Sequence, residues 1–251
     1  MDAFNLFMLV MSIVALFVFI SLFFVKAGYG IFVTPAWGPA INNRLAWVLM
    51  ECPVFLVMLA FALCSSGQTA SWVFFFLFQA HYFQRSFIFP FLMKGKSKMP
   101  VSVVLMGVVF NILNGLMNGL WIFYIYRDWG YDYSAVWLLQ PWFIAGVAVF
   151  FVGMLINLHS DHIIRNLRKE GDSSHHLPKG GMFNYVTSAN YFGEIVEWCG
   201  FALLTLSPAA LVFAWWTFAN LVPRAAAIHE RYIDEFGAEN VPAKKIFPFV
   251  Y

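Results

Sequence analysis

Charge is scarce in this chain. Only 11% of its 251 residues are Asp, Glu, Lys or Arg, while 61% are hydrophobic. A water-soluble domain usually carries about 25% charged residues. A globule of this length cannot hide so much apolar surface from water, because small globules leave a large share of their area exposed. The composition therefore excludes an ordinary soluble domain and favours a protein whose solvent is a lipid bilayer.

Cysteine is also sparse, and the usual metal and phosphate motifs are missing. Cys52, Cys64 and Cys199 stand alone in apolar runs, so we interpret them as small buried hydrophobes. His159 and His162 are accompanied by no Cys ligand or HExxH pattern, and we expect no metal. Without a GxGxxG or Walker loop, a nucleotide site would not be of the Rossmann type. No long Lys/Arg stripe suggests nucleic acid.

Long apolar runs are what the sequence has in abundance. A helix needs about 20 apolar residues to cross a bilayer. Seven runs qualify, at residues 4–25, 45–64, 71–93, 101–126, 136–158, 190–206 and 209–227. The first lacks a basic start and an A-x-A cleavage site, so we interpret it as a retained helix. The sequence predicts an all-α polytopic membrane protein, with seven transmembrane helices forming a single membrane domain over residues 1–251.

The basic residues gather in alternate loops. If the N-terminus lies outside, every Lys and Arg falls inside, except Arg127 in an outside loop and Arg85 within a run. The positive-inside rule therefore predicts an outside N-terminus and a cytosolic C-terminus. A bacterial inner membrane or an endoplasmic-reticulum membrane would fit. We expect a monomer whose active site opens to the cytosol.

Two polar side chains stand out in the apolar N-terminal half. Glu51 is a functional candidate, because a carboxyl group inside a membrane is costly, and burial favours its neutral, hydrogen-bond-donating form. The alternative is a packing hydrogen bond or a salt bridge to Arg44, seven residues earlier on the same helical face. Tyr82 shares a face with Gln79 and Ser86 and can polarise a carbonyl, although a lone tyrosine is more often simply packed.

A set of side chains suited to a nucleotide follows in the C-terminal half. Asn157, Asp161 and Arg168 fall within about 40° of one another on a helix, with Arg165 adjacent. The amide and the carboxylate can bind ribose or nicotinamide, and the guanidiniums can bind phosphates. The alternative is a solvated, basic helix end.

A second polar stripe lies in the sixth run. Asn190, Glu194 and Glu197 fall within about 60° on one helical face. Two acids on a lipid-embedded face need partners, and the arginines of the preceding basic loop are candidates. After the last run, Arg224 and Tyr232 can contact phosphate, although anionic lipid headgroups are an alternative.

In their order along the chain, these motifs resemble one known family. The runs NLHSD at 157–161, RNLRK at 165–169, PKGGMF at 178–183 and ANYFGEIVEW at 189–198 look like the signature of the steroid 5α-reductase family (3-oxo-5α-steroid 4-dehydrogenases). Weaker matches are GYG at 28–30, AWVLME at 46–51, HYFQR at 81–85 and the final FPFVY at 247–251. The resemblance covers nearly the whole chain.

The resemblance implies a seven-helix enzyme that reduces the 4,5 double bond of a 3-oxo-Δ4 steroid to a 5α-3-oxo steroid. Hydride would pass from the nicotinamide of NADPH to C5, and a proton would reach C4. Glu51 and Tyr82 would hydrogen-bond the 3-oxo group, which makes C5 electrophilic and stabilises the developing enolate. Trp47 and Trp198 would wall the steroid pocket. Substrate would bind within about residues 1–130, and NADPH within about 131–251.

The resemblance also implies which residues hold NADPH. They are Asn157, Asp161, Arg165, Arg168, Asn190, Glu194, Arg224, Tyr232, Lys96 and His175. The sequence departs from the family pattern at Met50, where the family often has Gln before its catalytic Glu.

Other functions compete with this hypothesis. A related membrane reductase could act on a polyprenol or an enoyl thioester, and a membrane methyltransferase could use a similar polar region. A seven-helix receptor would leave the two polar stripes unexplained. A retinal protein needs a Lys in its last span, and a transporter often has two related halves; neither feature is found here. The expected partners are therefore a steroid and the lipid bilayer, with no nucleic acid.

Overall fold

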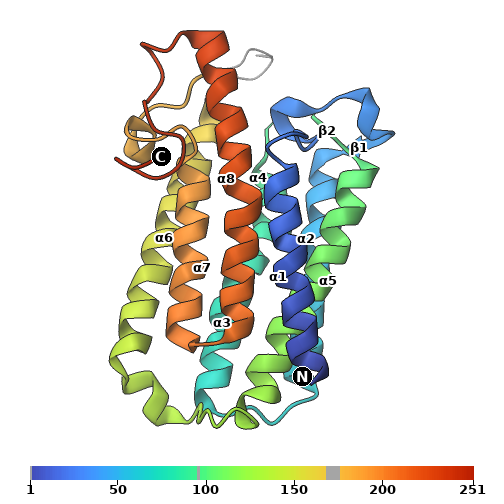
Figure 1. Ribbon diagram of the computed structural model, residues 1–251, viewed down its shortest axis with the longest axis vertical. Helices are drawn as coiled ribbons and strands as arrows, with labels where there is room; N and C mark the ends of the chain where they lie inside the picture. The colour runs from blue at the N-terminus through green and yellow to red at the C-terminus, as the bar shows by residue number, and fades with distance from the viewer. Residues whose placement is uncertain (1, 95–96, 168–175) are drawn as a thin grey trace. The chain divides into compact units, whose positions relative to one another are not determined.

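Helices dominate the fold, as the sequence predicts. The computed structural model describes residues 2–94, 97–167 and 176–251 (Figure 1). Its helices are α1 (Ala3–Ser21), α2 (Asn43–Leu63), α3 (Thr69–Phe83), α4 (Phe89–Leu92), α5 (Val101–Phe123), α6 (Pro141–Asn166), α7 (Ala189–Thr205) and α8 (Pro208–Phe236). Two short strands, β1 (Ala40–Asn42) and β2 (Lys98–Pro100), complete the regular elements described below.

All seven apolar runs lie largely within helices. Five helices, α1, α2, α5, α6 and α8, are long and apolar enough to cross a membrane, which fits a membrane-embedded protein. Helices α3 and α7 are shorter, with 15 and 17 residues. The third run is interrupted, because Gln84–Ile88 takes π-helical geometry between α3 and α4. The fifth run begins in a 3-10 helix (Ala135–Leu139), and its α-helix starts at Pro141, where proline suits the first turn.

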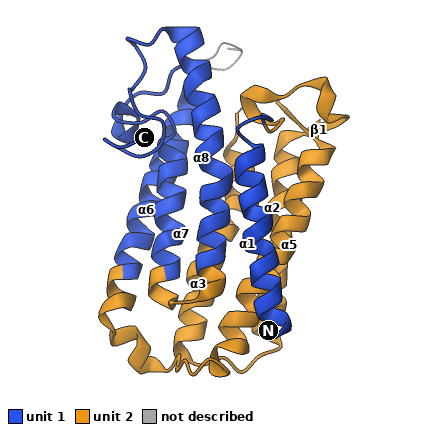
Figure 2. Ribbon diagram, viewed as in Figure 1, with its two compact units in different colours: residues 1–26, 146–202, 211–251 blue, residues 27–145, 203–210 orange. Residues whose placement is uncertain are grey.

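The chain divides into two compact units (Figure 2). Unit 1 comprises Met1–Lys26, Gly146–Ala202 and Leu211–Tyr251, and therefore contains α1 and most of α6, α7 and α8. Unit 2 comprises Ala27–Ala145 and Leu203–Ala210, and therefore contains α2, α3, α4 and α5.

In unit 2, a small sheet sets the starting points of α2 and α5. Strands β1 and β2 pair antiparallel, with Ala40 opposite Pro100 and Asn42 opposite Lys98. Helix α2 follows β1 directly and α5 follows β2 directly, so both helices start at this sheet. The side chain of Asn42 caps α2 by accepting a hydrogen bond from the backbone N–H of Arg44 at 2.9 Å.

Glycines on α5 let α2 approach closely. A Cβ built on Gly115 would lie 3.0 Å from Cβ of Val57, and one built on Gly119 would lie 3.0 Å from Cγ of Phe61. Small residues allow membrane helices to pack through close van der Waals contact. Together with the sheet, these contacts fix which residues of α2 face which residues of α5.

In unit 1, glycines bring the backbones of α6 and α7 together. A Cβ on Gly193 would lie 2.5 Å from the backbone nitrogen of Asn157, and one on Gly153 would lie 2.6 Å from the carbonyl oxygen of Gly193. Two turns further along α7, a Cβ on Gly200 would lie 2.7 Å from Cα of Phe150. These neighbours are backbone atoms that cannot move aside, so only glycine permits this helix pairing.

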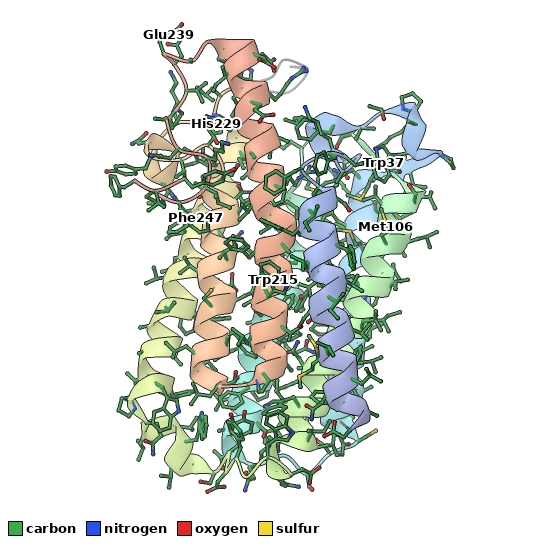
Figure 3. All side chains as sticks on the ribbon, in the orientation of Figure 1. Trp37, Met106, Trp215, His229, Glu239 and Phe247 are labelled. Carbon is green, nitrogen blue, oxygen red and sulfur yellow. The ribbon has the colours of Figure 1, made fainter. Side chains whose placement is uncertain are left out.

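Helix α8 packs against α1 within unit 1. The indole Nε1 of Trp215 donates a hydrogen bond to the carbonyl of Ser12 at 3.3 Å, and its ring centroid lies 5.8 Å from that of Phe19. Figure 3 shows Trp215 on α8 beside α1.

The C-terminal segment docks on the chain just before α7. The backbone N–H groups of Thr187 and Ser188 donate to the carbonyls of Lys244 and Lys245, each at 3.0 Å. The Thr187 hydroxyl also lies 3.3 Å from Nδ1 of His229, which Figure 3 shows on α8. These bonds hold the start of α7 in place.

Candidate functional site

A buried row of asparagines runs along α5 in unit 2. Asn111, Asn114 and Asn118 recur at spacings of three and four residues, which puts them on one helical face. They are 4%, 0% and 1% exposed. Buried amides need hydrogen-bond partners, because an unpaired polar group in an apolar helix bundle is costly. The sequence analysis missed this row, although three asparagines with helical spacing in an apolar run would have revealed it.

Asn111 holds the predicted carboxyl group. Its Nδ2 donates to Oε2 of Glu51 at 3.3 Å and to the backbone carbonyl of Met50 at 2.7 Å. The alternative salt bridge from Arg44 to Glu51 does not form among the described residues. Arg44 instead donates from Nη2 to the carbonyl of Met93 at 2.7 Å, just beyond the end of α4, where helix carbonyls lack intrahelical donors.

Asn114 holds the predicted phenol. Tyr82, on α3, is 3% exposed, and its hydroxyl oxygen accepts a hydrogen bond from Nδ2 of Asn114 at 3.0 Å. Asn114 is in turn bonded by Asn118, whose Nδ2 donates to Oδ1 of Asn114 at 2.8 Å and to its carbonyl at 3.2 Å. Helix α5 therefore provides an amide for both residues that the resemblance assigns to the substrate ketone.

The three residues predicted to share a polar face lie on α3 and on the π-helical segment that follows it. Gln79, Tyr82 and Ser86 are all buried, and Nε2 of Gln79 donates to the carbonyl of Phe55 on α2 at 3.1 Å. Two buried oxygen atoms on this face, Oε1 of Gln79 and Oγ of Ser86, have no hydrogen-bond partner among the described residues. Each such atom costs about 1–3 kcal/mol. The face around Tyr82 therefore has spare hydrogen-bonding capacity for a polar group of a ligand.

The two predicted tryptophans lie in different aromatic clusters. Trp47, in unit 2, packs edge-on against Phe89 at 5.2 Å, and the guanidinium of Arg85 lies 4.7 Å from its ring centroid. Trp198, in unit 1, is 1% exposed and lies 4.4 Å from Phe213, centroid to centroid.

In unit 1, the two predicted polar stripes meet at Asn190. Nδ2 of Asn157 donates to the carbonyl of Asn190 at 2.9 Å, and Nδ2 of Asn190 donates to Oδ1 of Asp161 at 3.3 Å. Asn157 and Asp161 are only 3% and 4% exposed. The close glycine contacts between α6 and α7 bring these groups within hydrogen-bonding distance. The prediction that Asn157 and Asp161 share a face is confirmed.

The basic residues of unit 1 differ in their surroundings. Arg224 is 6% exposed and donates from Nε to the hydroxyl of Tyr191 at 2.8 Å. Arg165 is partly exposed near the end of α6. Three predicted cofactor contacts lie outside the described residues: Lys96, Arg168 and His175.

Of the remaining predicted residues, Glu194 and Tyr232 are partly buried, on α7 and α8. The ring of Tyr232 lies 5.9 Å from that of Phe236, centroid to centroid. Glu197, the second acid of the α7 stripe, is fully buried.

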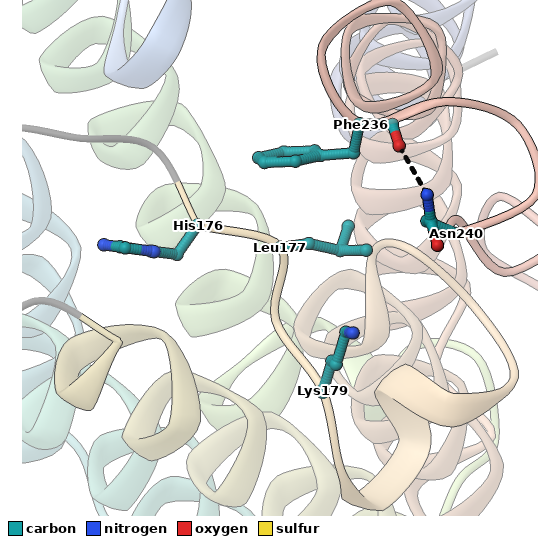
Figure 4. A pocket seen from close by; sticks show the side chains of 5 residues that line it. All are labelled: His176, Leu177, Lys179, Phe236 and Asn240. Atoms are coloured by element: carbon teal, nitrogen blue, oxygen red, sulfur yellow. Dashed lines mark hydrogen bonds between the residues drawn. The ribbon is translucent and has the colours of Figure 1, made fainter.

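Unit 1 also holds a cavity of about 320 Å³ at the C-terminal end of α8 (Figure 4). It is lined by His176, Leu177, Lys179, Phe236 and Asn240. Figure 4 shows Asn240 donating to the carbonyl of Phe236, at 2.9 Å. A lysine, an imidazole and an aromatic ring suit an anion that carries a planar group. Sequence analysis did not single out Phe236 or Asn240, because neither belongs to a recognisable motif.

Five apolar helices long enough to cross a membrane fit a membrane-embedded protein, and both units hold hydrogen-bonded, buried polar side chains. Comparison with known proteins then gives the family. Residues 97–251 match the family described as 3-oxo-5-alpha-steroid 4-dehydrogenase. The chain belongs to this family of oxidoreductases, as its resemblance predicted.

Several curated relatives are similar over nearly the whole chain. The steroid 5-alpha-reductase DET2 of Gossypium hirsutum is 38% identical over 97% of this chain and 96% of its own length. The 3-oxo-5-alpha-steroid 4-dehydrogenase 1 of Homo sapiens is 38% identical over 89% of this chain and 86% of its own length. The 3-oxo-5-alpha-steroid 4-dehydrogenase 2 of Sus scrofa is 38% identical over 92% of this chain and 91% of its own length.

Proposed function

We propose that the chain uses NADPH to reduce the 4,5 double bond of 3-oxo-Δ4 steroids to 5α-3-oxo steroids. The observation that carries this proposal is the polar cluster of unit 2, in which a partly buried carboxyl group and a buried phenol are each held by an asparagine of α5. Family membership supports it, because the relatives are named 3-oxo-5-alpha-steroid 4-dehydrogenases or steroid 5-alpha-reductases.

In this proposal, Glu51 and Tyr82 hydrogen-bond the ketone oxygen at C3. A neutral carboxylic acid and a phenol can each donate one hydrogen bond. These bonds draw electron density toward the oxygen, and C5 becomes electrophilic because the 4,5 double bond is conjugated to the ketone. They also stabilise the negative charge that develops on the oxygen as the enolate forms. A hydride added at C5 and a proton added at C4 complete the reduction.

NADPH supplies the hydride when it is bound. The residues proposed to hold it are Asn157, Asp161, Arg165, Arg168, Asn190, Glu194, Arg224, Tyr232, Lys96 and His175. Two further atoms support the fit: the buried hydroxyls of Ser160 and Ser188 have no partner in the described part of the chain. A ligand rich in hydroxyl and phosphate oxygens would satisfy such donors, which are costly when left unpaired.

We also propose that seven helices cross the membrane, with an outside N-terminus and a cytosolic C-terminus. Two observations support this topology. Each of the seven apolar runs forms helix, and nearly all the basic residues fall in the loops that it places inside.

The test is NADPH oxidation by the detergent-solubilised protein with testosterone, progesterone and a non-steroid enone. We expect oxidation that depends on a 3-oxo-Δ4 steroid and yields its 5α-reduced product, identified by chromatography. A matched control is the same steroid already saturated at C4 and C5, which should give no oxidation. We also expect NADPH, and not S-adenosylmethionine, to raise the temperature of unfolding, because a ligand stabilises the state that binds it.

Two outcomes would contradict the proposal. Oxidation with a polyprenol or an enoyl thioester, but with no steroid, would make the chain a reductase of another lipid. Protection from unfolding by S-adenosylmethionine alone would make it a methyltransferase.

A further inference from the structure

In the asparagine row on α5, a backbone carbonyl determines which way the side-chain amides are turned. A side-chain amide can be turned either way, and its orientation is assigned from its partners. Asn118 faces the backbone carbonyl of Asn114 at 3.2 Å, and a carbonyl can only accept. The atom of Asn118 on this side is therefore Nδ2. The same Nδ2 lies 2.8 Å from the side chain of Asn114, so the Asn114 atom that receives it must be Oδ1.

This orientation determines how Tyr82 is bonded. With Oδ1 of Asn114 turned toward Asn118, its Nδ2 is turned toward Tyr82, 3.0 Å away. An amide N–H can only donate, so the phenol oxygen accepts on its α5 side. The hydroxyl proton of Tyr82 must therefore point in another direction.

We propose that Asn114, oriented by Asn118, is a positioning residue that keeps the Tyr82 hydroxyl turned to donate its proton to the substrate ketone. This inference rests on the proposed role of Tyr82 in ketone reduction. Without Asn114, the phenol oxygen would lose the donor that fixes it as an acceptor on its α5 side.

Asn114 also has an electrostatic effect on the phenol. As negative charge develops on the ketone oxygen, Tyr82 donates more strongly and its own oxygen gains negative charge. The N–H of Asn114 points at that oxygen and stabilises this charge, and donors fixed in advance need no reorganisation during the reaction. Burial strengthens the effect, because Asn114 and Asn118 are 0% and 1% exposed and little water competes.

The experiment is a double-mutant cycle between Asn114 and Tyr82, using Asn114→Leu, Tyr82→Phe and the double variant. We expect Asn114→Leu to lower kcat by about 10- to 100-fold, because small misplacements of a reacting group have effects of this size. In the Tyr82→Phe background, the same change should lower kcat by less than about twofold, since residues that act through one another are not additive. The affinity for NADPH, measured by protection from thermal unfolding, should stay unchanged.

A second variant covers the case in which Asn114→Leu does not fold. Asn118→Leu removes the amide that orients Asn114, and we expect kcat to fall by about 3- to 10-fold. The matched control is Thr217→Val on α8, which replaces a buried polar side chain whose hydroxyl donates to the carbonyl of Phe213 in its own helix. It should leave kcat within about twofold of the starting protein, because the lost hydrogen bond lies within one helix.

The outcomes separate this inference from the proposed function. Suppose that Tyr82→Phe lowers kcat and that the double variant loses the product of the two single effects. Asn114 then acts independently of Tyr82, which overturns the positioning role but leaves the proposed function standing. Unchanged kcat in both asparagine variants overturns it as well. Full activity of Tyr82→Phe would instead remove Tyr82 from the reaction, and the proposed mechanism would fail together with the positioning role.

Discussion

The amide nitrogen of Asn111 lies 3.3 Å from Oε2 of Glu51, across a sequence separation of 60 residues. The same nitrogen donates to the carbonyl of Met50 at 2.7 Å, so the backbone of α2 determines which way the amide faces. One carboxyl oxygen of Glu51 is therefore held as an acceptor. The carboxyl group has a defined orientation even before a substrate arrives.

Replacing Glu51 with Gln should abolish most of the reaction. The amide keeps the size of the side chain but replaces an acid group with a weaker donor, so we expect the rate of steroid-dependent NADPH oxidation to fall by about 100-fold or more. NADPH should still protect the variant from thermal unfolding, because none of the proposed cofactor residues belongs to α2. Normal turnover in this variant would remove Glu51 from the mechanism.

Replacing Asn111 with Leu tests the orientation of Glu51 directly. The variant loses two hydrogen bonds, so we expect stability to fall by about 1–3 kcal/mol. The kcat should fall by about tenfold, because the carboxyl group is no longer held in one orientation. The control is Ile112→Val, one residue further along α5 on an exposed face, which should change kcat by less than about twofold. An unchanged kcat in Asn111→Leu would show that Glu51 does not need this amide.

Removing the guanidinium of Arg165, near the end of α6, or that of Arg168 should weaken NADPH binding. A hydrogen bond to a charged group contributes about 1.5–3 kcal/mol, so Arg165→Ala and Arg168→Ala should each raise the KM for NADPH by about tenfold or more. The steroid KM should change little. Arg127→Ala is the control, since Arg127 lies in unit 2 and bonds the carbonyl of Ser66. Equal KM values for NADPH in all three variants would mean that Arg165 and Arg168 do not bind the cofactor.

Adding a methyl group at Gly153 should separate α6 from α7. The new Cβ would lie 2.6 Å from the carbonyl oxygen of Gly193, a backbone atom, and we expect a loss of about 1–3 kcal/mol. Gly107→Ala is a matched comparison, because its Cβ would lie 2.5 Å from Sδ of Met50, a flexible side chain that can move. The unfolding temperature should fall more in Gly153→Ala than in Gly107→Ala. The affinity for NADPH should also fall in Gly153→Ala. Equal losses in the two variants would argue against backbone contact as the cause.

The composition and periodicity of the sequence determined much of this protein. Each of the seven apolar runs coincides largely with helix, because spanning a bilayer requires continuous apolar helix, and five of the helices are long and apolar enough to cross a membrane. Helical spacing alone placed Gln79, Tyr82 and Ser86 on one buried face, and Asn157 with Asp161 on another. These features are local, so neighbours along the chain were sufficient to predict them.

Only the tertiary structure decided how the helices meet and which polar groups pair. Arg44 was a plausible partner for Glu51 from spacing alone, yet it bonds the carbonyl of Met93, and Asn111 of α5 bonds Glu51 instead. That pairing depends on the β1–β2 sheet and on the glycine contacts between α2 and α5, which join residues some 60 positions apart. A hydrogen bond requires its atoms to lie within a few tenths of an ångström of the right distance, and helical periodicity carries no information about the register between two helices.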